Sequence, residues 1–327
     1  VLISLALSYD VDNVNFYILD YGNHGCMPLK ELPHTAEYIS ADDEERYWKF
    51  KKFIWEEVKA RKRLFAKYAA PSPLAYEELS GKTLKTVIIA VDQFDVVKEM
   101  GLEEEEFFTK LTRDGIGLGI YTVAAAARIH AVRQATLTNF KSKIAGYHFD
   151  ENETFLAVGR APFKQSDIKG RVLTGGDEVY EAQIYTMAPC EDKAVYSKSL
   201  KELIQQIRRR YPGKEAPHIP VLPQEFHAAM LYRYSGDEND YLVGLELEEV
   251  TGKGFDKSAG LFAVIGNTGA GKTNILCVIA EQAILKGRTC IFDSMDMELY
   301  HYRQESNVLY VEGRKEQELF LKEMAEE

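Results

Sequence analysis

Short apolar segments alternate with segments of helical spacing over the first half of the chain. Residues 14–19, 86–91 and 116–127 are apolar runs with few polar positions, which is typical of buried strands. Residues 40–68 carry apolar side chains every three or four positions, and residues 103–112 predict a second, acidic helix. Strands that are apolar on both faces and separated by helices are typical of a parallel sheet covered on each side.

The long helix at residues 40–68 has a stripe of large apolar side chains. Ser40 and Asp43 at its start are suitable N-terminal caps, and the run Pro71-Ser72-Pro73 ends it. We interpret the stripe as core packing, because periodic apolar positions on a helix usually face the interior. It consists of Tyr47, Phe50, Ile54, Val58, Phe65 and Tyr68.

The pattern changes in the second half of the chain. Residues 191–210 predict a helix, and the prolines of residues 216–223 favour an extended, stiff connection. A new α/β pattern starts near Tyr241. We therefore expect three parts, which are a first domain at residues 1–188, a helix and proline-rich linker at residues 189–235, and a second domain at residues 236–327.

One segment of the second domain carries a chemical motif. Residues 261–265 form an apolar, strand-like run, and residues 274–286 predict a helix. Between them lie Gly266, Asn267, Thr268, Gly269, Ala270, Gly271, Lys272 and Thr273. Between a strand and a helix, this G-x-x-x-x-G-K-T sequence is typical of a phosphate loop, whose backbone N–H groups surround nucleotide phosphates. We predict ATP and Mg²⁺ as ligands, with Lys272 on the β and γ phosphates and the Thr273 hydroxyl on the metal.

A phosphate loop also needs a carboxylate at the end of a neighbouring strand, where it holds the metal. The predicted strand at residues 288–293 directly follows the phosphate-loop helix, a position that suits the second strand of such a fold. The strand at residues 86–92 ends in a suitable Asp92-Gln93 pair, but it lies far upstream, before the linker.

An internal repeat accounts for both observations. Residues 1–20 and residues 275–293 each consist of an apolar helix, a polar turn, an apolar strand and a final aspartate, Asp20 or Asp293. We expect two tandem domains of similar fold. The first is expected to begin just after a phosphate loop, and the second to end before its own metal-binding strand.

These segments resemble the FtsK/SpoIIIE-type ATPases, and in particular the tandem-module ATPase of type VII secretion systems, the EssC/EccC kind. The likeness rests on the phosphate loop, on residues 15–35 (NFYILDYGNHGCMPLKELPHT) and on residues 288–302 (RTCIFDSMDMELYHY). It implies an α/β fold of two RecA-like P-loop NTPase modules, with mainly parallel sheets flanked by helices, both incomplete in this chain.

The first module departs from the family pattern at two places. The family has Asp-Glu at the second nucleotide motif (Walker B), where this chain has Asp92 and Gln93. Gln93 cannot accept a proton, so we expect weak or no hydrolysis there, although Asp92 stays a candidate Mg²⁺ ligand. Alanines stand where DNA-pumping members have polar residues, and the following Arg128 either contacts nucleotide or caps the sheet edge.

The resemblance also implies a function for the intact protein. It implies a membrane-anchored ATP hydrolase on the cytoplasmic face of the cell membrane, which exports small helical proteins together with other secretion subunits. It further implies self-association into a ring, with an arginine from a neighbour completing each site. The candidates for that arginine are Arg113, Arg133 and Arg171. By themselves, the 327 residues are expected to bind ATP weakly at most and to hydrolyse none.

Composition bears on the alternatives. With 40 basic and 51 acidic residues the net charge is −11, which argues against a large cationic face for nucleic acid, although a DNA translocase of the same superfamily stays an alternative. A second alternative is a scaffold that holds nucleotide without turnover. The basic run at residues 208–210 is either a solvated helix end or a patch for lipid, an acidic partner or nucleic acid.

The lengths of the apolar runs and the spacing of the cysteines argue against two kinds of protein, one that crosses a membrane within these residues and one held by zinc or disulfides. No apolar run approaches the roughly 18 residues that a membrane-spanning helix needs. The four cysteines lie far apart and form no CxxC pair, so neither a zinc site nor a disulfide framework is expected. They are Cys26, Cys190, Cys277 and Cys290.

Overall fold

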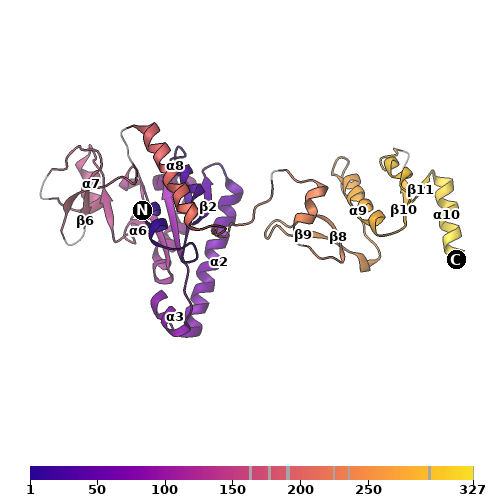
Figure 1. Cartoon of the computed structure of the whole chain (residues 1–327), viewed down its shortest axis with the longest axis horizontal. Coiled ribbons are helices and arrows are strands. Elements are labelled where there is room, and N and C mark those ends of the chain that lie inside the picture. The colour runs from indigo at the N-terminus through magenta and orange to yellow at the C-terminus, as the bar shows by residue number, and fades with distance from the viewer. Residues whose placement is uncertain are drawn as a thin grey trace. The chain divides into compact units, whose positions relative to one another are not determined.

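The chain forms two compact units, Val1–Ile219 and Pro220–Glu327. The computed structural model describes residues 1–161, 164–175, 178–188, 192–223, 225–234, 236–293 and 296–326. Figure 1 shows the ribbon with several of its helices and strands labelled. Each unit has its own sheets and its own hydrophobic core.

The first unit is built on a four-stranded sheet in which all strands are parallel, in the order β2-β1-β3-β4. This arrangement confirms the predicted parallel α/β fold. The elements up to β4 are α1 (Leu2–Ser8), β1 (Val14–Asp20), η1 (Met27–Glu31), β2 (Thr35–Ser40), α2 (Glu44–Tyr68), α3 (Pro73–Ser80), β3 (Thr86–Asp92), η2 (Phe94–Val96), α4 (Val97–Met100), α5 (Leu102–Asp114), η3 (Ile116–Leu118) and β4 (Ile120–Ala124).

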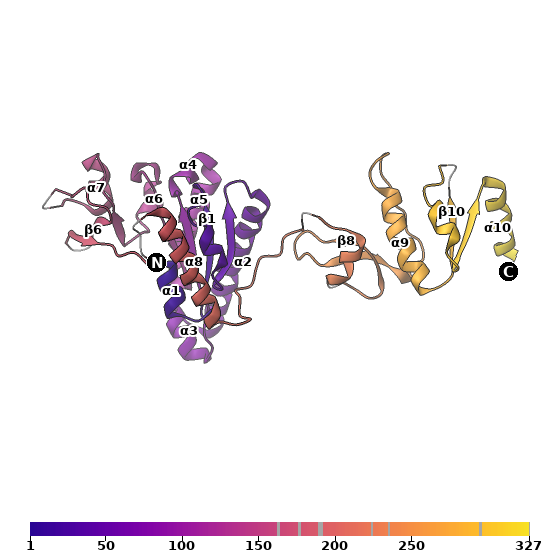
Figure 2. The ribbon, with the colours of Figure 1, turned by 45° about the horizontal axis from the view of Figure 1, so that its top comes forward.

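Helices cover both faces of this sheet. On one face, Phe50 of α2 and Phe108 of α5 pack in the same core as Leu19 of β1. On the other face, Ile204 of α8 (Lys193–Arg210) packs in the same core as Ile18 of β1 and residues of α1. Figure 2 shows α8 running along this face. Successive side chains of a strand point to opposite faces of the sheet. Since helices cover both faces here, β1 is buried along its whole length.

The helix predicted at residues 40–68 begins later than expected. Ser40 ends β2, and Asp43 caps α2 by accepting a hydrogen bond from the backbone N–H of Arg46 at 3.1 Å. The predicted stripe does face the core. Phe50, Ile54, Val58 and Phe65 are buried, and Tyr47 and Tyr68 pack against them.

The strand predicted at residues 116–127 is shorter than expected. β4 covers only Ile120–Ala124, because the preceding residues form the 3-10 turn η3 and Gly119 has a φ of +74°. The buried Arg61 of α2 holds this turn through its guanidinium, which donates to the carbonyl oxygens of Leu118 at 2.8 Å and Gly119 at 3.2 Å.

A small antiparallel subdomain follows β4 and was not predicted. Three short strands pair in the order β5-β6-β7, and α7 packs on them. The elements are η4 (Ile129–Ala131), α6 (Gln134–Leu137), β5 (Lys143–Ala145), α7 (Glu151–Val158), β6 (Arg171–Gly175) and β7 (Tyr180–Gln183).

The beginning of the predicted linker lies along the outer edge of β2. The backbone N–H of Ile219 donates to the carboxylate of Glu37 at 2.7 Å, and the same carboxylate pairs with the Arg46 guanidinium at 2.7 Å. The Glu37 side chain is only 1% exposed. Residues 216–219 are therefore anchored on the first unit.

The second unit contains an antiparallel hairpin and a separate parallel strand pair. Its core is small, and the Gln282 amide of α9 joins that helix to the hairpin through the backbone N–H and carbonyl of Leu242, at 3.0 and 2.7 Å. The elements are η5 (Ala228–Arg233), β8 (Asp240–Leu245), β9 (Gly252–Asp256), η6 (Lys257–Ala259), α9 (Lys272–Lys286), β10 (Thr289–Asp293), η7 (Tyr300–Gln304), β11 (Val308–Glu312) and α10 (Arg314–Glu326).

The strand predicted at residues 261–265 is not formed. These residues pair with no strand in the described part of the chain, and Leu261 and Ile265 are 92% and 91% exposed. An apolar run becomes a strand only when a neighbouring strand satisfies its backbone groups, and none of the described strands pairs with this run.

The internal repeat is visible in the structure. α1, β1, η1 and β2 correspond in order to α9, β10, η7 and β11. The last paired residues are Asp20 with Ser40 in the first unit and Asp293 with Glu312 in the second. An irregularity in the pairing of β1 with β2, which β10 and β11 lack, is the main departure.

Candidate nucleotide site

The predicted phosphate loop lies at the N-terminus of α9. Gly271 caps the helix, and Gly269 and Gly271 have φ angles of +82° and +81°, which glycine adopts without steric cost. A Cβ atom on Gly266 would lie 3.1 Å from the Cβ of Ala270, so a larger side chain would crowd the turn. The loop is exposed, and the first N–H groups of a helix have no partner within the helix. Its backbone can therefore be approached by an anion.

The two side chains expected to contact nucleotide and metal are held by neighbours. The Lys272 ammonium donates to the carbonyl oxygen of Asn267 at 2.9 Å, which folds the side chain over the loop. The Thr273 hydroxyl donates to the carboxylate of Glu298, in the segment after β10. Sequence reasoning missed Glu298, because only the fold brings it to the start of α9.

The repeated aspartates hold the segment that follows each strand. Asp20 and Asp293 each accept a hydrogen bond from the backbone N–H six residues further on, at 2.9 and 2.8 Å. Each also accepts from a tyrosine hydroxyl of the neighbouring strand, Tyr38 at 2.9 Å or Tyr310 at 2.7 Å. Partial burial and the bond to Asp293 raise the pKa of Tyr310 to about 12, and burial with the bond to Asp20 raises the pKa of Tyr38. Both hydroxyls therefore stay protonated donors at neutral pH.

Asp92 and Gln93 lie beside Asp20 at the carboxyl edge of the first sheet. Asp92 is paired in register with Asp20, and burial together with the Asp20 charge raises the pKa of Asp92. Gln93 has a φ of +52°, and a Cβ atom on Gly22 would lie 2.7 Å from the Gln93 amide nitrogen. The glycine therefore makes room for the glutamine side chain, and the sheet edge presents a close pair of carboxylates.

The structure does not bring Asp92 and Thr273 into one sheet. Asp92 ends β3 in the four-stranded sheet of the first unit, whereas Thr273 begins the helix that precedes β10 in the second. The two candidate sites therefore lie in different compact units.

Arg128 lies beyond the end of β4 rather than at it. It is exposed and caps the turn η4 through its backbone. Within the described residues its guanidinium makes no hydrogen bond or ion pair, so no bond to the sheet edge is seen, and contact with nucleotide stays a prediction.

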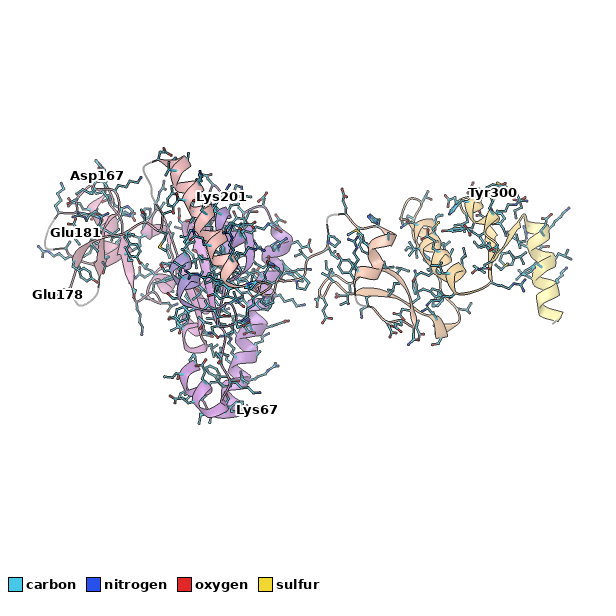
Figure 3. The ribbon with its side chains drawn as sticks, viewed as in Figure 1. Lys67, Asp167, Glu178, Glu181, Lys201 and Tyr300 are labelled. Atoms are coloured by element: carbon cyan, nitrogen blue, oxygen red, sulfur yellow. The ribbon has the colours of Figure 1, made fainter. Side chains whose placement is uncertain are left out.

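Two of the three arginines considered for a neighbouring site are engaged within the first unit. Arg113 pairs with Asp114 at 2.7 Å, and Arg171 pairs with Glu181, labelled in Figure 3, at 3.0 Å. Arg133 is exposed, and in the described part of the chain its side chain has no ion pair. It is therefore the most available of the three.

The basic run at the end of α8 is partly engaged as well. The Arg208 guanidinium pairs with Glu31 at 3.3 Å and also contacts Glu215, and the Tyr211 hydroxyl donates to the carbonyl oxygen of Tyr9 at 3.0 Å. These contacts tie the helix end to the first unit, which favours the interpretation as a solvated helix terminus.

The residues around Thr273 fit a magnesium ion. Mg²⁺ prefers oxygen ligands and usually binds through few protein groups together with substrate phosphates. Thr273 and Glu298 supply a hydroxyl and a carboxylate at the phosphate loop. In the described ranges, no group of three or more His, Cys, Asp or Glu residues could hold a metal by itself.

Two expectations from composition can be compared with the structure. Cys26, Cys277 and Cys290 are free, and Cys190 lies outside the described residues. Among the helices that the structure describes, none combines the length and the apolar character needed to cross a bilayer.

Comparison with known proteins gives consistent matches, although no family model matches the chain. The ESX secretion system protein YukB of Bacillus subtilis is 36% identical over 327 residues, which cover 98% of this chain and 22% of the relative. The EccC protein of Geobacillus thermodenitrificans is 32% identical over 324 residues, which cover 96% of this chain and again 22% of the relative. The chain thus spans less than a quarter of these relatives.

Solved structures agree with the sequence matches. EssC (ATPases 2 and 3) from Geobacillus thermodenitrificans superposes with a TM-score of 0.93 at 30% identity, over 99% of this chain and 64% of that one. A Thermomonospora curvata EccC structure (ATPases 2 and 3), solved in complex with a signal sequence peptide, matches 99% of this chain and 60% of its own, with a TM-score of 0.62 at 21% identity, which shows the fold alone.

The fold and the phosphate loop together define two RecA-like P-loop NTPase modules in tandem. The chain belongs to the FtsK/SpoIIIE-type ATPases, and within them it is most like the tandem-module ATPases of type VII secretion systems, the EssC/EccC kind.

Proposed function

We propose that this chain is the nucleotide-handling segment of a type VII secretion ATPase, in which the second module binds ATP and Mg²⁺. The observation that carries the proposal is the exposed phosphate loop at the start of α9. Its N–H groups and the helix dipole attract phosphate, and Lys272 adds a positive charge. Thr273 supplies the hydroxyl expected to contact Mg²⁺.

The first module is proposed to be degenerate. Gln93 stands where a glutamate would accept a proton from water, and an amide cannot take that role. Asp92 and Asp20 still place two carboxylates at the sheet edge. This module is therefore proposed to hold nucleotide or to regulate its neighbour rather than to turn over.

For the whole protein we infer a translocation ATPase at the cytoplasmic face of the cell membrane, which assembles into a ring and acts on small helical proteins. Support comes from the EssC and EccC relatives and from the EccC structure that contains a signal sequence peptide. DNA is the less favoured cargo, since the net charge of this chain is −11.

Nucleotide binding by the 327-residue chain tests the proposal. A fluorescent ATP analogue with Mg²⁺ is expected to bind weakly, and Lys272→Ala to reduce that binding roughly 10- to 100-fold, because it removes a charged hydrogen bond to phosphate. Lys286→Ala, at the other end of α9, serves as the matched control and should leave binding unchanged. Absence of binding, or equal binding by both variants, contradicts the proposed function.

Hydrolysis separates a motor from a scaffold. The chain alone is proposed to release no phosphate steadily, because residues 261–265, which precede its phosphate loop, form no strand in the described part of the chain. The full-length protein is expected to turn over ATP and to lose that activity on Lys272→Ala. A full-length protein that binds ATP without turnover would instead support the scaffold alternative.

A further inference from the structure

The contact between Thr273 and Glu298 has no counterpart in the motifs used to recognise the site. The Thr273 hydroxyl donates its hydrogen to the Glu298 carboxylate, although the two residues are 25 positions apart. Thr273 is the second residue of α9, and Glu298 lies between β10 and η7. The contact therefore joins the phosphate loop to the segment after the second strand of the module.

The backbone around Glu298 is fixed by the repeated aspartate. The carboxylate of Asp293 accepts from the N–H of Leu299 at 2.8 Å, directly beside Glu298, and from the Tyr310 hydroxyl at 2.7 Å. Met297 has a φ of +53°, a left-handed conformation that is strained for a non-glycine residue and persists only where surrounding contacts impose it.

Aromatic packing adds to this support. Tyr300, labelled in Figure 3, packs edge-on against Tyr310, with ring centroids 5.9 Å apart, and its N–H donates to the carbonyl oxygen of Met297 at 3.2 Å. Glu298 is therefore presented to Thr273 by a braced segment, even though its own side chain is exposed.

The chemistry of a threonine that binds a metal explains what this contact could do. A hydroxyl that offers a lone pair to a cation still carries a hydrogen, and that hydrogen needs an acceptor. A carboxylate is a strong acceptor, and such outer groups orient metal ligands and raise their affinity. We propose that Glu298 is the positioning residue that accepts the Thr273 hydrogen and thereby turns the hydroxyl oxygen toward the Mg²⁺ of the bound nucleotide. This role rests on the proposed function of the phosphate loop.

The first module differs at the corresponding position. Asp20 accepts from the N–H of Cys26, and Asp293 accepts from the N–H of Leu299, so the two aspartates occupy equivalent positions. In this alignment Gly25 corresponds to Glu298. A Cβ atom on Gly25 would meet nothing within 4 Å, so packing does not require a glycine there. The first module therefore has no carboxylate at the position that matches Glu298. It also has an amide, Gln93, where the family has a glutamate.

The test is the magnesium dependence of nucleotide binding by the 327-residue chain. The anisotropy of a fluorescent ATP analogue is followed while Mg²⁺ is added after EDTA. Glu298→Ala is expected to raise the Mg²⁺ concentration at half-maximal binding about 10- to 100-fold. Glu298→Gln, which keeps an acceptor oxygen without the charge, is expected to raise it less. The control Glu305→Gln changes an exposed glutamate of the same segment and should have no effect.

Two further measurements separate orientation of the ligand from a general loss of structure. Binding in EDTA should not be weakened by Glu298→Ala, and thermal unfolding should be unchanged. In a Thr273→Ala background, Glu298→Ala should cost nothing more, since the hydroxyl that it orients is gone.

The outcomes distinguish this inference from the proposed function. If the unmodified chain shows no Mg²⁺-dependent binding, the proposed function fails and the role of Glu298 falls with it. If the unmodified chain shows such binding but Glu298→Ala has the same Mg²⁺ dependence, the role of Glu298 is wrong while the proposed function stands. Equal losses with and without Mg²⁺ would also overturn it.

Discussion

The two copies of the helix–strand–turn–strand unit share their internal bonds but differ in their neighbours. β1 pairs on both sides, with β2 and β3, and all seven of its residues are buried. β10 pairs only with β11 in the described part of the chain, and Phe292 on it is 39% exposed. The aspartate, the tyrosine and the 3-10 turn of the unit nevertheless form in both. Local bonds therefore come from the repeated sequence, whereas burial depends on the neighbouring strands.

The largest expected difference concerns the strand interiors. Ile18 of β1 is fully buried, and Ile291 occupies the corresponding place in β10 with 6% exposure. Ile18→Ala should lower the free energy of unfolding of the first unit by roughly 4 kcal/mol, because dense packing on both faces leaves a cavity that cannot collapse. Ile291→Ala should cost roughly 2 kcal/mol in the small, more open core.

Hydrogen exchange of peptides from β1 and β10 measures both values in one chain. The tryptophans, Trp48 and Trp55, both lie on α2, so their fluorescence follows the first unit independently. Equal losses at the two positions would show that the difference in neighbours does not affect core packing.

The next effect concerns the outer edge of β2. In the described part of the chain, residues 216–219 of the linker cover this edge, and nothing is seen to cover the matching edge of β11. Glu37→Ala removes the buried carboxylate that Arg46 and the N–H of Ile219 share, and breaking such a pair costs roughly 3 kcal/mol. Release of residues 216–219 should also speed protease cleavage there. Glu31→Ala, which removes an exposed partner of Arg208, is the control and should change stability by less than about 1 kcal/mol. Unchanged cleavage in Glu37→Ala would contradict anchoring of the linker.

The sequence predicts those parts of the fold that depend on local patterns. The apolar runs at residues 14–19 and 86–91 became β1 and β3, and the helical stripe became the buried face of α2. The run at residues 261–265 is equally apolar, yet it forms no strand, because pairing is decided by neighbours rather than by composition. The strands β5 to β7 were missed because they have only three to five residues each, too few for a clear alternation.

The same division applies to the candidate site. The phosphate loop is a contiguous motif, so its residues could be selected from the sequence. Glu298 meets Thr273 only in the folded module, because the two residues lie 25 positions apart and share no sequence motif. Arg128 was expected at a strand end, but β4 stops earlier, at Ala124, whose partner Val91 forms the last pair between β3 and β4.

A smaller effect tests whether the two aspartates are held alike. Tyr38→Phe removes a hydroxyl that donates to the fully buried Asp20, and losing a hydrogen bond to a charged group should cost roughly 1–2 kcal/mol. Tyr310→Phe removes the matching bond to Asp293 and should lower the unfolding temperature of the second unit in the same direction, but less, because that site is more open to water. Hydrogen exchange of the segments after β1 and β10 measures both. A loss of stability in only one of the two units would show that the tyrosine–aspartate bonds of the two copies are not equivalent.

The smallest expected effect depends on β3, a neighbour of β1 that has no counterpart beside β10 in the described part of the chain. Burial and the charge of Asp20 raise the pKa of Asp92, so the folded first unit binds that proton more tightly than the unfolded chain does. The stability that the proton confers is present below the ordinary Asp value of 3.8 and is lost as pH rises through the raised value. Asp92→Asn stays neutral at every pH. It should therefore raise the unfolding temperature at pH 7, followed by tryptophan fluorescence, and make no difference below the ordinary value. A lower unfolding temperature at pH 7 would mean that the Asp92 charge stabilises the sheet edge, and the two carboxylates would then not repel each other.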